Sequence, residues 1–98
     1  MRFDWDSRKA NANQRKHRVS FEEACTVFAD ESVLTRYDEV HSSGEERWVS
    51  IGLAQTGRVL VVNHTWPVPD ETGDEMLRII SARRANHRER AVYVERRL

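Results

Sequence analysis

Arginine is concentrated in one short segment of the chain. Residues 78–90, RIISARRANHRER, contain five arginines, and the whole chain has 14 Arg but only 2 Lys. Like charges at close range repel one another, so the crowding brings little stability to the chain itself. The planar guanidinium group binds phosphate or carboxylate through two parallel hydrogen bonds. The segment therefore indicates a site for an anion outside the chain.

The same segment spans a junction between a predicted strand and a predicted helix. Asn86 and Glu89 have the spacing of a capping box, which places the start of the helix. Strand alternation puts Arg83 on the face opposite Arg78 and Arg84, while the first helical turn adds partial positive charge beside them. His64 comes near the end of a neighbouring strand. Arg90 and Tyr93 follow on the helix. Each of these side chains could equally serve the fold through ion pairs or core contacts.

Hydrophobic periodicity predicts the elements that position this junction. A short strand contains Phe3 and Trp5, and a helix capped by Asp6 or Ser7 then runs to about His17. Ser20 and Glu23 form a capping box for a second helix, whose apolar stripe includes Cys25. Four strands follow, over about residues 33–38, 47–54, 58–66 and 75–83, with a loop over 67–74. We expect an α+β domain: a mainly antiparallel sheet of four to five strands, two N-terminal helices and one C-terminal helix, with the helices covering one face.

Composition limits the remaining possibilities. A chain of 98 residues predicts a single domain over 1–98. The net charge is zero, but residues 1–20 carry +4, residues 21–46 carry −7 and residues 78–98 carry +5. No apolar run approaches the roughly 20 residues of a membrane span, and the single cysteine fits a reducing cytoplasm. The four histidines are far apart in the sequence and no glycine-rich phosphate loop is present, so we expect no metal and no cofactor.

Five motifs, in order along nearly the whole chain, resemble the BrnT family. They are FDWD at 3–6, KHRVSFEEA at 16–24, EERWVSIG at 45–52, RVLVVNHT at 58–65 and RIISARRANHRER at 78–90. The resemblance implies a RelE-like fold and a type II toxin that inhibits translation by cleaving RNA. It also implies neutralisation by a BrnA-like antitoxin with a ribbon-helix-helix domain, and a complex that represses its own operon, so operator DNA is contacted only through the antitoxin.

One departure from the family concerns the end of the first helix. Arg18 stands where the family usually has glycine after KH. Glycine there would end the helix in the left-handed conformation at little cost, because it has no side chain. Arginine either adopts that conformation at some cost or the helix ends differently.

Metal-independent RNA cleavage by the 2′-hydroxyl needs a base, cations for the pentacoordinate phosphate and an acid. We expect Arg83 to clamp the phosphate, assisted by Arg84 or Arg78, with His64 or Glu89 as the base. The side chains expected to contact RNA are Arg78, Arg84, Arg90, Tyr93, Lys16 and His17. Two alternatives remain. If folding brings the two basic segments together, residues 1–20 and 78–98 would form one positive face, which could dock an acidic antitoxin segment without catalysis. Alternatively, the protein could regulate DNA, although the balanced pI of ≈ 6.9 is low for that role.

Overall fold

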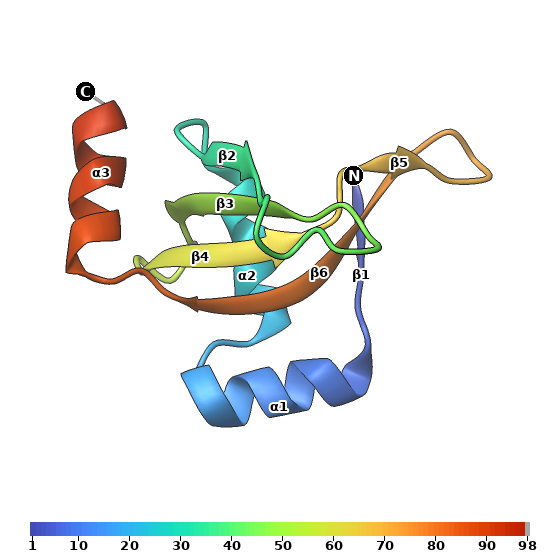
Figure 1. Ribbon diagram of the computed structural model, residues 1–98, viewed down its shortest axis with the longest axis horizontal. Helices are drawn as coiled ribbons and strands as arrows, with labels where there is room; N and C mark the ends of the chain where they lie inside the picture. The colour runs from blue at the N-terminus through green and yellow to red at the C-terminus, as the bar shows by residue number, and fades with distance from the viewer. Residues whose placement is uncertain (98) are drawn as a thin grey trace.

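The computed structural model describes residues 1–97, which form three α-helices, one 3-10 helix and six strands (Figure 1). In chain order these are β1 (Arg2–Asp4), α1 (Ser7–His17), α2 (Phe21–Cys25), η1 (Thr26–Ala29), β2 (Leu34–Tyr37), β3 (Trp48–Leu53), β4 (Val59–His64), β5 (Val68–Pro69), β6 (Glu75–Arg84) and α3 (His87–Arg97). The predicted α+β class is confirmed. None of the helices in this range has the length and apolar character needed to cross a membrane.

The strands form one mixed sheet in the order β1-β6-β4-β3-β2, and β5 pairs with β6 outside this path. Every pairing is antiparallel except that of β1 with β6. The sheet has six strands instead of four to five because β5 lies within the segment predicted as a loop. Pro69 is tolerated there because β5 is a two-residue strand at the edge of the sheet.

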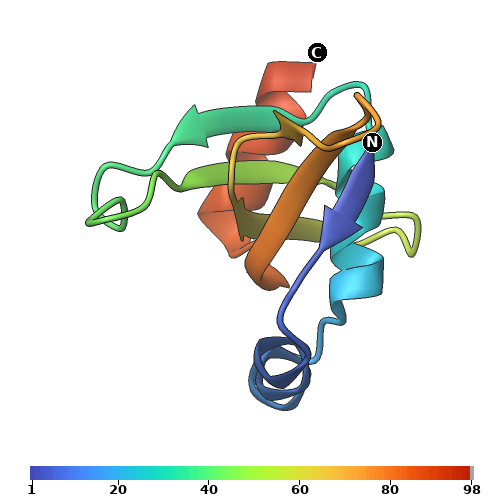
Figure 2. The same cartoon turned by 90° about the vertical axis from the view of Figure 1, so that its right-hand side faces the viewer.

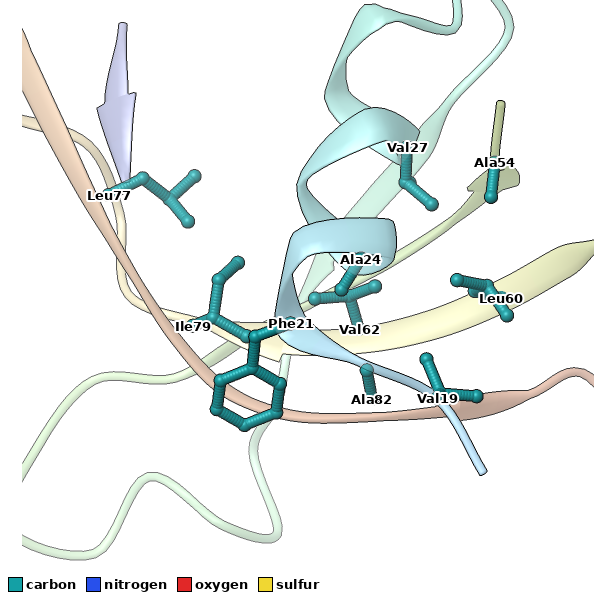
Figure 3. Packing of buried hydrophobic residues seen from close by; sticks show 10 residues of the cluster. All are labelled: Val19, Phe21, Ala24, Val27, Ala54, Leu60, Val62, Leu77, Ile79 and Ala82. Atoms are coloured by element: carbon teal, nitrogen blue, oxygen red, sulfur yellow. The ribbon is translucent and has the colours of Figure 1, made fainter. Parts of the chain in front are cut away.

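The core lies between one face of the sheet and the segment α2–η1. Figure 3 shows Phe21, Ala24 and Val27 of this segment facing side chains of β4 and β6. Leu60 and Val62 of β4 are fully buried there. Gly52 lets η1 come close to the sheet, because a Cβ atom at this position would lie 2.7 Å from Cγ1 of Val27. We call the face that carries Leu60 and Val62 the core face, and the opposite one the open face.

The predicted helix starts are confirmed, and each is stabilised by a local side chain. Asp6, not Ser7, caps α1 by accepting a hydrogen bond from Arg8 N–H (2.8 Å), and Ser20 Oγ accepts one from Glu23 N–H (3.0 Å). Arg18 ends α1 in the left-handed conformation (φ 59°), and its N–H donates to Gln14 O. The expected cost of arginine at this position, about 1–2 kcal/mol, therefore applies.

Asn13 attaches α1 to the outer edge of β6, at a position where no strand of residues 1–97 pairs with it. Its side-chain amide donates to the carbonyls of Val19 (3.0 Å) and Ala82 (2.8 Å), and its oxygen accepts from Ala82 N–H (3.0 Å). Strand β1 covers the outer edge of β6 only at three residues, 76–78. Without Asn13, the N–H and carbonyl of Ala82 at the same edge would have no partner. Asn13 is buried, and its side-chain amide makes the two hydrogen bonds to Ala82 that a neighbouring strand would make at this edge.

Helix α3 does not share the core face with α2 and η1, and α1 lies along the outer edge of β6, which corrects the expectation that all helices cover one face. Helix α3 stands at the end of the sheet where β6 finishes, whereas α2 and η1 lie behind the sheet (Figures 1 and 2). Its buried anchor is Tyr93, whose hydroxyl donates to Asp30 Oδ2. Side chains of α3 border a cavity with Val49 and Ile51 of the open face. The open face is therefore partly uncovered and flanked by α3.

Candidate functional site

Arg83 and Glu89 form a two-point ion pair at the open face. Arg83 projects from β6 beside Val61, its partner position on β4. Its Nη1 and Nη2 donate to Glu89 Oε1 and Oε2, both at 2.8 Å. The predicted capping box is confirmed and holds Glu89 in place: Asn86 N–H donates to Glu89 Oε1, and Glu89 N–H donates to Asn86 Oδ1, each at 2.8 Å. The local sequence thus determines where Glu89 meets Arg83.

The electrostatics of the pair favour its ionised form. Hydrogen bonds from Arg83 are the main cause that lowers the pKa of Glu89, and Arg36 adds a smaller effect. The same hydrogen bonds raise the pKa of Arg83. The Arg83 side chain is 43% exposed and the Glu89 side chain is 23% exposed, so an anion from solvent can reach the guanidinium group. The site therefore offers a planar, two-donor cation whose present partner is an exchangeable carboxylate.

A cavity of about 400 Å³ adjoins this pair between α3 and strands β2 and β3. Its floor is apolar and includes Val49, Ile51 and Val92. Three arginines line it together with Glu89, namely Arg36, Arg88 and Arg96. Sequence reasoning did not select these three. The four-residue spacing of Arg88, Val92 and Arg96 was a usable signal for one helical face, whereas Arg36 needs the pairing of β2 with β3 to be placed.

His64 is not brought to the Arg83–Glu89 pair. It is buried on the core face, where Nε2 lies 2.6 Å from Ser50 Oγ and Nδ1 lies 2.8 Å from Thr65 O. The ring of Phe28 packs edge-on against it, with 4.9 Å between centroids. Burial lowers the pKa of His64, although the hydrogen bond with the Thr65 carbonyl opposes this. The imidazole therefore serves as a neutral, satisfied group in the sheet.

We expect the burial of His64 to make the protein less stable as the pH falls. The unfolded chain binds a proton near pH 6.5, whereas the folded chain does so only at lower pH, so the unfolded state holds more protons in between. The free energy of unfolding should fall by up to about 1.4 kcal/mol per pH unit below pH 6.5. Urea titrations at pH 5.0–7.5 measure it. His64→Gln should flatten this slope and His87→Gln should retain it; an equal slope in the wild-type protein and His64→Gln would contradict the assignment.

The remaining arginines selected from the sequence have separate surroundings. Arg78 forms an ion pair with Glu45. Arg84, at the end of β6, lies on the core face and its charge contributes to the lowered pKa of Glu23. Arg90 is exposed on α3. The structure thus places Arg83 on the open face and Arg84 on the opposite one, as strand alternation predicted. The prediction that Arg78 shares the face of Arg84 is wrong, because the register of β6 against β4 shifts between Asn63 and His64. Leu77 and Ile79 therefore point to the core, and Arg78 between them points away from it.

Tyr93, Lys16 and His17 also lie apart from the Arg83–Glu89 pair. Tyr93 is 1% exposed and contacts Asp30. Lys16 and His17 belong to the last turn of α1, where Lys16 is exposed and His17 is half-buried. Within residues 1–97, none of the described hydrogen bonds or ion pairs joins these three side chains to Arg83 or Glu89.

The remaining reactive groups are the Cys25 thiol and the potential metal-ligating side chains. Burial raises the pKa of the Cys25 thiol to about 11, which leaves the thiol protonated; Cys25 is partly buried and packs against the core, as its place in the predicted apolar stripe indicates. In the part of the chain that the structure describes, no three His, Cys, Asp or Glu side chains are grouped closely enough to hold a metal ion.

Comparison with known proteins gives one family. The model of the family described as "Ribonuclease toxin, BrnT, of type II toxin-antitoxin system" matches residues 5–89. This range begins directly after β1 and contains every later strand and the Arg83–Glu89 pair. A comparison with curated proteins found no match.

Proposed function

Since the chain belongs to the BrnT family of ribonuclease toxins of type II toxin–antitoxin systems, we propose that its open face cleaves RNA at the Arg83–Glu89 pair without a metal ion. The observation that carries this proposal is the half-exposed two-point ion pair beside an arginine-lined cavity. A phosphodiester presents the same pair of oxygen acceptors to a guanidinium group as a carboxylate does. The backbone of RNA can therefore take the place of Glu89 on Arg83.

This exchange would activate Glu89. Hydrogen bonds from Arg83 are the largest cause that lowers the pKa of Glu89. When a phosphate occupies the guanidinium group, those bonds are lost and the basicity of the carboxylate increases. Glu89 would then be a free carboxylate beside the bound phosphate, held in position by its hydrogen bond from Asn86 N–H. Substrate binding and base activation are one event in this scheme.

The reaction proceeds by transesterification. Glu89 accepts the proton of the 2′-hydroxyl, whose oxygen attacks the adjacent phosphorus. The bond from phosphorus to the 5′ oxygen breaks, the leaving oxygen takes a proton from solvent, and the products carry a 2′,3′-cyclic phosphate and a 5′-hydroxyl. Arg83 stabilises the charge that builds on the phosphate oxygens. Arg36, Arg88 and Arg96 hold the neighbouring phosphates.

The proposed partner is a BrnA-like antitoxin with a ribbon-helix-helix domain, acting in the cytoplasm. Through it, and not directly, the toxin would contact operator DNA and help repress its own operon. The balanced charge of the chain supports this division of labour, because a protein that grips duplex DNA alone is usually strongly basic. Co-purification and gel-shift measurements with and without the antitoxin test it.

A second candidate function is supported by the cavity itself. Its floor of Val49, Ile51 and Val92 is apolar and its arginines are cationic. An amphipathic acidic segment of an antitoxin would satisfy both features. In that case the arginines would serve partner binding without catalysis.

Incubation of the purified protein with RNA in excess EDTA distinguishes the two functions. We expect cleavage of free RNA, with fragments that end in a 2′,3′-cyclic phosphate. An Arg83→Ala protein purified in the same way controls for contaminating ribonucleases. Cleavage that requires added Mg²⁺ would contradict the proposed chemistry, and tight binding of an acidic peptide without any cleavage would favour the second function.

A further inference from the structure

Three aromatic side chains form a partly exposed cluster at the end of the sheet remote from α3. Tyr37 packs edge-on against Trp48, with 5.4 Å between centroids and 76° between planes. Trp48 also contacts Trp66 at 4.5 Å and 46°. Trp66 is 53% exposed and Tyr37 is 40% exposed. We call these three residues the aromatic cluster. Large aromatic side chains left exposed together are typical of interaction surfaces.

Strand pairing holds the aromatic cluster in place. Tyr37 of β2 is directly paired with Trp48 of β3, and Trp48 is paired with His64 of β4. Trp66 follows His64 by two residues, immediately after β4. Because Trp48 pairs with the core-face residue His64 and alternates with Val49, the cluster belongs to the core face and not to the open face that holds Arg83. It is therefore a second surface, independent of the proposed catalytic one.

A negatively charged segment adjoins the aromatic cluster. The loop over residues 38–47 starts directly after Tyr37, ends directly before Trp48, and contains four carboxylates and one arginine. Glu45 and Glu46 border a hollow of about 400 Å³ together with Trp66. Glu45 is paired with Arg78, whereas Glu39 and Glu46 are exposed. We call residues 38–47 the acidic loop.

The indole N–H of Trp48 is a further sign of an incomplete surface. Its Nε1 is buried and has no hydrogen-bond acceptor among residues 1–97. A buried donor without an acceptor costs about 1–3 kcal/mol. Trp66, which packs on Trp48, is more than half exposed and lies outside the regular strands. A donor without an acceptor beside a half-exposed indole ring is a feature that a carbonyl oxygen of a bound chain would satisfy.

We propose that the aromatic cluster and the acidic loop bind a cationic segment of a partner protein, one that presents arginine or lysine. A guanidinium or ammonium group is attracted to the faces of Trp66 and Tyr37 and to the exposed carboxylates of Glu39 and Glu46. RNA is disfavoured at this surface because the same carboxylates repel phosphate. The inference does not depend on catalysis at Arg83.

Nuclear magnetic resonance can test the proposal, because each tryptophan gives its own indole N–H signal. The probe is the peptide acetyl-(Arg-Ala)₃-amide, and the control peptide carries neutral citrulline in place of arginine. We expect saturable shifts of the Trp48 and Trp66 signals with the arginine peptide only. Trp5 packs on Phe21 in a different part of the molecule and serves as an internal control whose signal should not move.

Variants separate the contributions of the aromatic and acidic groups. Trp66→Ala and the double variant Glu39→Gln/Glu46→Gln should each weaken peptide binding by about two- to fivefold, the scale of one exposed cation–π or charge contact. Trp66→Phe should restore most of the affinity, and Glu22→Gln, an exposed carboxylate on α2, should leave it unchanged. Circular dichroism confirms folding of each variant. Equal binding by Trp66→Ala, equal binding of the citrulline peptide, or larger Trp66 shifts with a single-stranded RNA oligonucleotide would each overturn the proposal.

Discussion

Replacement of Arg83 by alanine should reduce RNA cleavage by about 100- to 1,000-fold, the usual effect of removing one donor that stabilises transition-state charge. In the proposed mechanism Arg83 binds the scissile phosphate and stabilises the charge on its oxygens, and the variant loses both interactions. Glu89 without Arg83 keeps its basicity, so the loss reports on the phosphate contact. The fold should persist. The ion pair is partly exposed, and pairs of this kind contribute about 1 kcal/mol or less to stability. Initial cleavage rates and a thermal melt of the same protein provide both measurements.

Matched variants show whether the effect belongs to one face of the sheet. Arg84→Ala changes the next residue of β6, which lies on the core face, and should cost less than about tenfold. Arg8→Ala removes an exposed arginine of α1 and should have no effect. Glu89→Gln keeps an oxygen that can accept the Asn86 N–H but cannot accept a proton, so it should be nearly as inactive as Arg83→Ala. A folded Arg83→Ala protein that cleaves RNA at the wild-type rate would exclude the proposed role.

Replacement of Asn13 by alanine should lower the free energy of unfolding by roughly 3–5 kcal/mol. The change leaves Ala82 N–H and the carbonyls of Ala82 and Val19 without partners in a buried location, and each such group costs about 1–3 kcal/mol. This is a large share of the 5–15 kcal/mol that is typical of a small domain. Urea unfolding followed by tryptophan fluorescence measures the difference.

Two further variants of α1 test this explanation. Asn11→Ala alters an exposed asparagine of the same helix and should change stability by less than about 0.5 kcal/mol. Asn13→Asp keeps an acceptor for Ala82 N–H but cannot donate to either carbonyl, so it should be destabilised as well. If Asn13→Ala unfolded at the same urea concentration as Asn11→Ala, water would have to replace the side chain and the edge contact would be unimportant.

Local sequence signals determined the helix starts and the geometry of the ion pair. Asn86 and Glu89 formed the complete capping box that was predicted. Ser20 and Glu23 formed half of theirs: Ser20 Oγ accepts from Glu23 N–H, whereas the Glu23 carboxylate accepts from Arg58 instead of from Ser20 N–H. The capping interactions join residues three apart, so they depend little on the rest of the fold. The same holds for strand alternation, which separates Arg83 from Arg84. The five sequence motifs also indicated the BrnT family, and the match of the family model to residues 5–89 confirms it.

Only the tertiary structure decided which distant groups meet. The side chain of Asn13 meets Ala82 across 69 residues, and β1 reaches β6 in parallel. Neither contact has a local signature, because a polar residue in a helix and a short strand are compatible with many partners. His64 has the chemistry of a base, yet the pairing of β4 with β3 places it against Ser50. Arg36 joins the cavity only because β2 pairs with β3 and α3 packs beside them. Sequence spacing specifies neighbours along one element, whereas register and helix packing select the face and the partner, and those depend on burying the whole core at once.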